Sequence, residues 1–314
     1  YCTDLPFLYF LYSLPFASLP SKTELLYKYP FLLYDKYNKK HEYVRKDSVM
    51  FNFFIIMDEN LGNTIARHFS SKYLNYTINF IISKEFPSFS DFPDFSLVLC
   101  DLDQNIELAK KYNLPAIAFS HENNKQETLM GTPWMILDAD ALSPFFLREV
   151  YCRHHHIPLM ITTTSRCTIR ELTVKQLPKL LLLQKENKNN PSGCFFPQNC
   201  CTTVAAETFL LDYIKNQYSF YGYGIYGIFK KTDDAFLGIA GFSPLENTED
   251  YYVEIGYSIL KEWQRQGFAS EVLPALLHFE KEYLRFTEVI TRIEKENIVS
   301  IRLAKKNLLR IITI

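Results

Sequence analysis

The sequence has little glycine, no cysteine pair of the CxxC kind and almost no excess of charge. Its 314 residues include 34 Lys and Arg against 35 Asp and Glu, which gives a net charge of −1. Proteins that hold nucleic acid or anionic lipid by general electrostatics carry concentrated basic charge, so we expect neither partner here. With 47% hydrophobic residues the chain can bury a sizeable core, and at about 100–200 residues per domain its length suggests two domains.

The cysteines argue against both a disulfide framework and a metal site. There are seven of them, and an odd number cannot form a closed set of disulfides. Cys194, Cys200 and Cys201 share a polar loop, but zinc ligands usually come as two closely spaced pairs, so we expect ordinary thiols and no metal. A reducing, cytoplasmic location fits this cysteine usage best.

The start of the chain lacks a recognisable targeting segment. The apolar stretch 5–19 is interrupted by Pro6 and Pro15 and has no basic flank before it. It is also shorter than the roughly 20 residues of a spanning helix, so we expect neither a membrane span nor a signal peptide. Residues 1–48 show no sustained hydrophobic period and remain unassigned.

From residue 49 to 150 the pattern predicts a small α/β domain with a parallel sheet. Apolar runs of strand length cover 51–57, 96–100 and 115–119, and helical spacing covers 63–73 and 106–112. Strands that alternate with helices imply parallel pairing through right-handed crossovers.

An acidic sequence follows the second of these strands. Cys100-Asp101-Leu102-Asp103-Gln104-Asn105 resembles the later acidic motif of HAD-type phosphatases. Those enzymes need several carboxylates around Mg²⁺, yet Asn105 stands where a second Asp is expected, and Asp58-Glu59-Asn60 is a poor nucleophile motif. We therefore interpret 49–150 as a HAD-like domain that is noncatalytic, with a Mg²⁺-dependent phosphatase as the less favoured alternative.

Prolines and three adjacent histidines at 154–156 predict a linker at 151–165, and a second domain follows at 166–314. There the pattern predicts a strand at 167–172, helices at 174–186 and 203–220, and strands at 225–229, 236–242 and 252–260. A helix at 268–284, a strand at 289–293 and a helix from 297 come after them.

Glycine is concentrated in this second domain. The whole chain has 10 glycines, and seven of them lie between 222 and 267. The strand Glu254-Ile255-Gly256-Tyr257 leads into Gln264-Arg265-Gln266-Gly267-Phe268-Ala269-Ser270, which opens an amphipathic helix. Unpaired N–H groups and the helix dipole make such a start an anion site, and small residues let a diphosphate approach the backbone.

Three motifs in order carry a resemblance over residues 166–308. They are the EIGY strand, the WQRQGFASEVL helix start and the ENIVSIRLAKKN helix. Together they resemble the GNAT acetyltransferase superfamily, in the branch similar to ribosomal-protein N-acetyltransferases. The resemblance implies a mixed sheet that opens between the EIGY strand and the strand at 289–293, with acetyl-CoA between them.

The resemblance also implies which residues contact the cofactor. The diphosphate would lie on the amides of Gln264, Arg265, Gln266, Gly267, Phe268, Ala269 and Ser270. The pantetheine arm would pair with the backbone of Tyr257, Ser258 and Ile259, and Asn297 and Ser300 would contact the far arm. An amine would attack the thioester carbonyl directly while a backbone N–H stabilises the oxyanion, and the C–S bond would then break as CoA leaves as its thiolate.

Attack requires a neutral amine. A lysine amine, with a pKa of about 10.4, is neutral roughly once in 2,500 molecules at pH 7, so we expect a base and nominate Glu254, acting through a water. An α-amino group, with a pKa of about 8, needs less help. Protein N-termini and small-molecule amines are therefore the acceptors we expect; the acceptor's identity and the oligomeric state stay open.

Two features depart from the family pattern. Ala304 stands where many relatives place a tyrosine general acid, and the chain ends at Ile314, before most of the closing hairpin that the fold implies. We therefore expect a C-terminally truncated domain with an exposed sheet edge and a helix kinked at Pro274. A catalytically impaired CoA-binding or regulatory module is the alternative to an active N-acetyltransferase.

Overall fold

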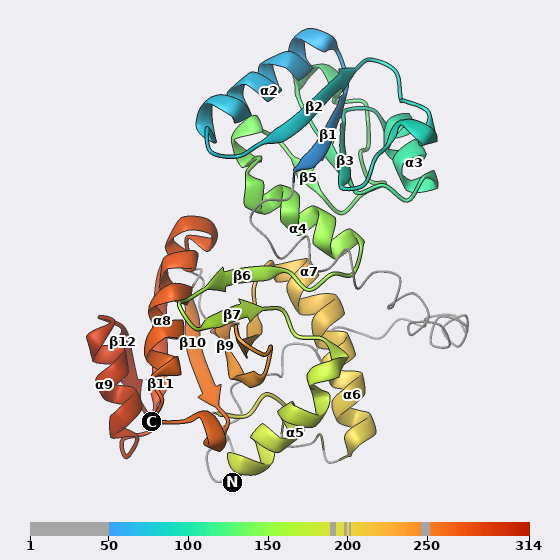
Figure 1. Ribbon diagram of the computed structural model, residues 1–314. Helices are drawn as coiled ribbons and strands as arrows, with labels where there is room; N and C mark the ends of the chain where they lie inside the picture. The colour runs from blue at the N-terminus through green and yellow to red at the C-terminus, as the bar shows by residue number, and fades with distance from the viewer. Residues whose placement is uncertain (1–49, 189–192, 198–199, 201, 246–251) are drawn as a thin grey trace. The chain divides into compact units, whose positions relative to one another are not determined.

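The computed structural model describes residues 50–188, 193–197, 200, 202–245 and 252–314. Our decision to leave 1–48 unassigned concerns residues outside this part. The chain divides into two compact units between Leu159 and Met160, within the segment that we expected to be a linker. Each unit is described by itself (Figure 1).

The first unit is built on a parallel sheet whose five strands follow the order β2-β1-β3-β4-β5. The inner strands β1 and β3 are buried along their whole length, as parallel strands covered on both faces must be. The strands are β1 (Phe51–Ile56), β2 (Ile78–Ser83), β3 (Ser96–Cys100), β4 (Ala116–Phe119) and β5 (Met135–Ile136). The predicted parallel sheet is confirmed, but β2 was not predicted, because it is an edge strand of mostly half-buried residues.

Helices connect these strands and follow the sheet. They are α2 (Glu59–Lys72), α3 (Asp103–Lys111) and α4 (Pro144–His154). Helix α2 begins four residues earlier than predicted because the Asp58 side chain accepts the N–H groups of Asn60 and Leu61 and so caps it. Helix α4 was not predicted at all. Ser143 caps it and His154 ends it, so the first residues of the expected linker at 151–165 are helical.

The second unit contains a mixed sheet of seven strands in the order β12-β11-β10-β9-β8-β7-β6. The strands are β6 (Met160–Thr163), β7 (Cys167–Arg170), β8 (Ile225–Lys230), β9 (Phe236–Pro244), β10 (Tyr252–Ile259), β11 (Glu288–Ile293) and β12 (Arg310–Thr313). Neighbours from β6 to β10 pair antiparallel, whereas β10 with β11 and β11 with β12 pair parallel. Strand β6 lies inside the expected linker, so this segment is part of the sheet.

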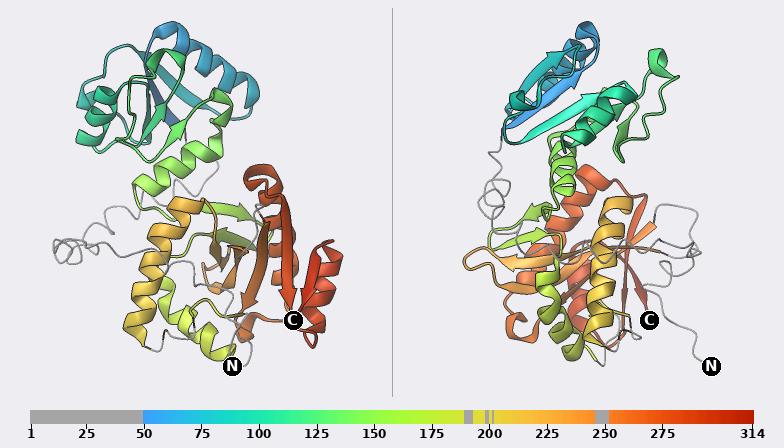
Figure 2. Two further views of the ribbon diagram at one scale, coloured as in Figure 1. Left: turned by 180° about the vertical axis from the view of Figure 1, so that it is seen from behind. Right: turned by 90° about the vertical axis from the view of Figure 1, so that its right-hand side faces the viewer.

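Five helices accompany this sheet in the described residues: α5 (Leu177–Glu186), α6 (Thr203–Asp212), α7 (Tyr218–Tyr221), α8 (Phe268–Phe279) and α9 (Ile298–Lys306). Figure 2 shows α5 and α6 side by side, while α8 packs against β6, β7, β9 and β10. Pro274 lies inside α8 without ending it. None of the described helices is both long and apolar enough to pass through a bilayer.

Candidate functional site

The sheet of the second unit opens between its parallel strands β10 and β11. Strands β10 and β11 pair only from Tyr252 with Glu288 to Glu254 with Ile290. Beyond this point β10 stays paired with β9 as far as Ile259, while β11 stays paired with β12. We call the point after Glu254 the fork. The separation predicted between the EIGY strand and the strand at 289–293 is therefore present.

Glu254 is the last residue of β10 before the fork, and its side chain reaches across to β11. Its carboxylate accepts from the backbone N–H of Arg292 at 3.3 Å and from Arg292 Nε at 2.8 Å. Arg292 Nη2 lies 2.7 Å from the same carboxylate, and the Glu254 side chain is only 7% exposed. The side chain of the candidate base thus accepts a backbone N–H of β11 just beyond the last paired residues of the two strands, and it is held in an ion pair.

The loop 264–270 follows β10 and delivers the chain to α8. Gly267 caps that helix in the left-handed region, with φ +82°, which favours glycine. In the described part of the chain, none of the N–H groups from 267 to 270 donates to a backbone carbonyl outside the helix. Free donors at a helix start suit an anion, and their contact with a diphosphate stays a prediction.

Two glutamine side chains hold this loop from within. Gln264 Nε2 donates to the Ile259 carbonyl at 2.8 Å, and Gln266 Nε2 donates to the Glu262 carbonyl at 3.0 Å. These side chains, and the Ile259 carbonyl, serve the loop's own conformation. What the loop offers a ligand is its backbone.

The last two predicted contact residues lie at the start of α9. The Asn297 side chain caps the helix by accepting from the Ser300 N–H at 3.2 Å. The Tyr257 hydroxyl of β10 donates to Ser300 Oγ at 3.0 Å. Burial raises the pKa of Tyr257 above its ordinary value, although the bond to Ser300 opposes this. The fork is therefore bridged by side chains both at Glu254 and at Tyr257.

Sequence reasoning missed the residues that brace these elements. Arg292 pairs with Glu254, and Asn187 at the end of α5 donates to Ser258 Oγ at 2.9 Å. Arg166 contacts both the loop 264–270 and α8. Spacing along the chain holds no signal for contacts between residues 71 or 105 positions apart.

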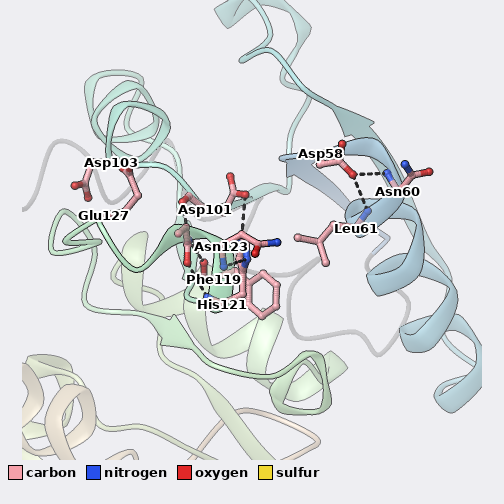
Figure 3. A network of polar contacts seen from close by, with 10 residues as sticks. Asp58, Asn60, Leu61, Asp101, Asp103, Phe119, His121, Asn123 and Glu127 are labelled. Carbon is pink, nitrogen blue, oxygen red and sulfur yellow. Dashed lines mark hydrogen bonds and ion pairs between the residues drawn. The ribbon is translucent and has the colours of Figure 1, made fainter.

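The aspartates of the two acidic motifs in the first unit, Asp58, Asp101 and Asp103, lie just after the ends of the parallel strands β1 and β3 (Figure 3). Asp101 follows β3, and its Oδ2 lies 3.3 Å from His121 Nε2 after β4. Asp103 accepts from the N–H groups of Thr128 and Leu129, which helps to hold its pKa below the ordinary value. Asp58 caps α2. Most of these carboxylates are thus used within the fold, with Asp101 Oδ1 left as a buried oxygen without a hydrogen-bond partner.

Across the described residues, no group of three or more His, Cys, Asp or Glu side chains could hold a metal ion. Asn105, which stands where the phosphatase motif has a second Asp, is buried within α3.

Comparison with known proteins covers the second unit. Residues 166–308 match the family model of the acetyltransferase (GNAT) domain, the span over which the sequence motifs suggested it. A GnaT-family acetyltransferase from Bordetella pertussis is 18% identical over 46% of this chain and 84% of its own, with a TM-score of 0.39. A ribosomal-protein-serine acetyltransferase from Vibrio cholerae is 22% identical over 46% and 79%, with a TM-score of 0.34. The RimL ribosomal alpha-N-protein acetyltransferase in complex with coenzyme A is 19% identical over 47% and 82%, with a TM-score of 0.39.

Proposed function

We propose that this chain, whose residues 166–308 match the acetyltransferase (GNAT) domain, transfers an acetyl group from acetyl-CoA to a primary amine. The observation that carries the proposal is the fork joined to the loop 264–270. Beyond Glu254 one edge of β10 has no strand beside it, and the chain then runs directly into a helix start with unsatisfied N–H groups.

The fit to coenzyme A follows from these two features. An extended arm that carries amide groups matches an unpaired strand edge, because that edge offers N–H and C=O groups at regular intervals. A diphosphate matches the N–H groups at 267–270, and Gly267 keeps the backbone open to it. Acetyl-CoA supplies a thioester carbonyl that is open to direct attack, and the chain's residues hold it and position the amine.

The role of Glu254 bears on the acceptor. Its carboxylate is engaged by Arg292 through the backbone N–H and the guanidinium, which leaves it fewer free lone pairs for a water. A weakly assisted site favours amines that are already partly neutral. At pH 7 about one in ten α-amino groups is neutral, against roughly one in 2,500 lysine amines. We therefore propose protein N-termini or small-molecule amines of low pKa as acceptors.

The same ion pair favours one alternative, a module that binds CoA without turnover. A carboxylate whose main partner is a guanidinium has a sufficient structural reason to be there. For the first unit we propose a noncatalytic HAD-like role, supported by the use of Asp58 and Asp103 within the fold. Buried, unbridged thiols at Cys100 and Cys167 support a reducing compartment such as the cytoplasm.

Thiol release from acetyl-CoA tests the proposal. The chain is incubated with acetyl-CoA and a panel of peptides that carry either a free N-terminus or a blocked N-terminus with an internal lysine, and small amines complete the panel. We expect faster release with the free α-amine. Tight CoA binding without release for any amine would support the inactive module instead.

A further inference from the structure

The turn between β6 and β7 lies against the loop 264–270, although about 100 residues separate them. This turn is itself rigid. The Thr164 N–H donates to the Cys167 carbonyl at 2.9 Å, and the Cys167 N–H donates to Thr164 Oγ1 at 2.9 Å. The Lys231 N–H adds a bond to the Arg166 carbonyl at 2.8 Å. These hydrogen bonds hold the backbone from which the Arg166 side chain extends.

Arg166 makes several contacts with the loop and the helix that follows it. Its Nη2 donates to the Gln266 carbonyl at 3.0 Å, and its Nε donates to the Glu271 carboxylate. Its guanidinium also covers the Phe268 ring, with Cζ 4.4 Å from the ring centroid. These contacts hold the residue before Gly267, the residue after it and the first turn of α8.

Glu271, in the first turn of α8, accepts hydrogen bonds from three residues of the turn between β6 and β7. Its carboxylate accepts from the Thr164 hydroxyl at 3.0 Å, the Ser165 hydroxyl at 2.9 Å and the Arg166 N–H at 3.4 Å. Burial acts to raise the pKa of Glu271, but hydrogen bonds from Arg166, Ser165 and Thr164 outweigh it, and the pKa lies below its ordinary value. A fully charged carboxylate near an anion site would by charge alone repel a diphosphate, so its presence needs a structural reason.

We infer that Arg166 and Glu271 are positioning residues that hold the loop 264–270 in the conformation that binds the diphosphate of CoA. This inference rests on the proposed function. Two residues of the loop have unusual backbone angles, which explains why contacts from outside the loop are needed. Arg265 and Gly267 both have positive φ, at 59° and 82°, and a loop with such backbone angles is one of many conformations open to the chain. The contacts of Arg166 with Gln266 and Phe268 stabilise this conformation before the ligand binds.

The contact geometry requires an arginine. One planar guanidinium donates in two directions, to a carboxylate and to a carbonyl, while its face lies on a ring. A lysine ammonium retains the charge but lacks this fork. The inference also assigns a function to Thr164 and Ser165, which precede the residues matched by the family model and fall in the expected linker.

The test combines calorimetric CoA binding in the full chain with hydrogen exchange at bonded amides next to the contacts of Arg166 and Glu271, namely the Gln264 N–H and those of 271–273 in α8. The variants are Arg166→Met, Arg166→Lys and Glu271→Gln. Arg310→Met is the matched control, because Arg310 forms a similar exposed pair with Glu288 at 3.0 Å between β11 and β12. Thermal unfolding of each variant confirms that it is folded.

We expect each of the three variants to speed exchange at Gln264 and at 271–273 and to weaken CoA binding by about 10- to 100-fold, the equivalent of one or two charge-assisted hydrogen bonds. The control should change neither. Glu271→Gln is the most telling variant, because removing a negative charge near the diphosphate should tighten binding if charge alone matters. Binding of 3′-dephospho-CoA should suffer the same loss as binding of CoA.

Several results would overturn the inference. Tighter binding by Glu271→Gln, full recovery by Arg166→Lys, or a loss seen with CoA but not with 3′-dephospho-CoA would each replace positioning with direct electrostatics. If the unmodified chain fails to bind CoA, the proposed function fails. Faster exchange at Gln264 and at 271–273 in Arg166→Met would still establish that Arg166 holds the loop, and unchanged exchange would refute it.

Discussion

The two units treat the ends of their strands in opposite ways. In the first unit, the polar side chains that follow the parallel strands bind mainly to backbone groups of the same unit, as Asp103 does with the N–H groups of Thr128 and Leu129. In the second unit, two parallel strands separate at Glu254, and side chains brace the fork while backbone groups at 267–270 stay unsatisfied. A binding site requires free polar groups held in place, and the second unit provides them.

The comparison predicts that loss of backbone access at the loop has the largest effect. Gly267→Glu forces a side chain into a left-handed position and its Cβ to 3.3 Å from Arg166 Nη2, and it adds a negative charge at an anion site. We expect CoA binding to weaken by about 100-fold or more, ~2.7 kcal/mol, in calorimetry.

Gly222→Glu is the matched control, since Gly222 has φ +72° and no atom within 4 Å of an added Cβ. It carries a similar backbone strain and the same charge. Equal losses of CoA affinity in the two variants would show that the loop is not the diphosphate site.

The polar network of the first unit should instead govern stability. The buried Asn124 side chain donates to the carbonyls of Asp101 and Phe119 and accepts from the His121 N–H. Asn124→Ala should lower the free energy of unfolding of this unit by about 2–4 kcal/mol, because it leaves buried groups unpaired. Denaturant titration measures this, with the exposed neighbour substitution Asn123→Ala as control. Any loss of CoA affinity in Asn124→Ala would contradict the separation of roles.

Two roles of the ion pair between Glu254 and Arg292 can be distinguished: holding the strands in position, or supplying the catalytic base. Glu254→Gln and Arg292→Met should each leave CoA affinity within about threefold and lower turnover by roughly tenfold, ~1.4 kcal/mol, if the pair positions the strands. A double variant should then be no worse than either single one. If only Glu254→Gln lowers turnover, and the acidic limb of the pH–rate profile disappears with it, Glu254 is the base.

The bridge from Tyr257 to Ser300 should have a smaller effect. Tyr257→Phe removes one hydrogen bond of 3.0 Å, and we expect CoA affinity to change by a few-fold, about 0.5–1.5 kcal/mol. Ser300→Ala should have the same effect, and the double variant should show no further change. Additive losses would mean that each hydroxyl contacts the ligand separately.

The buried tyrosines of the second unit and Asp103 of the first unit should make stability depend on pH at opposite ends of the scale. Burial raises the pKa of Tyr213 and of Tyr218, so the folded form retains protons that unfolded tyrosines release above about pH 10. Their contribution to the stability of the second unit should be fully present below that pH and be lost as pH rises further. Backbone hydrogen bonds from Thr128 and Leu129 lower the pKa of Asp103, so its contribution to the first unit is present above about pH 4 and is lost as pH falls. Unit-resolved hydrogen exchange across pH would show both limbs, and a reversed order would contradict the assignment.

Sequence reasoning located the fork and the loop 264–270 of the second unit because both depend on backbone conformation. Gly267, the apolar strand β10 and the cap Asn297 leave local signatures that can be identified from neighbouring residues. The edge strand β2 and helix α4 left weak signatures, and β6 was hidden in a segment interpreted as a linker. The partners Arg292, Arg166 and Glu271 could not be predicted, because only the folded sheet brings them to the fork and the loop.

The most direct test of the account is calorimetric titration of the full chain with CoA, combined with hydrogen exchange with and without the ligand. The account predicts saturable binding, stabilisation of about 2.7 kcal/mol at 100 times the dissociation constant, and protection confined to residues 255–259, 264–270 and the start of α9. Absence of binding by a folded chain, or protection that lies instead in the first unit, would contradict it.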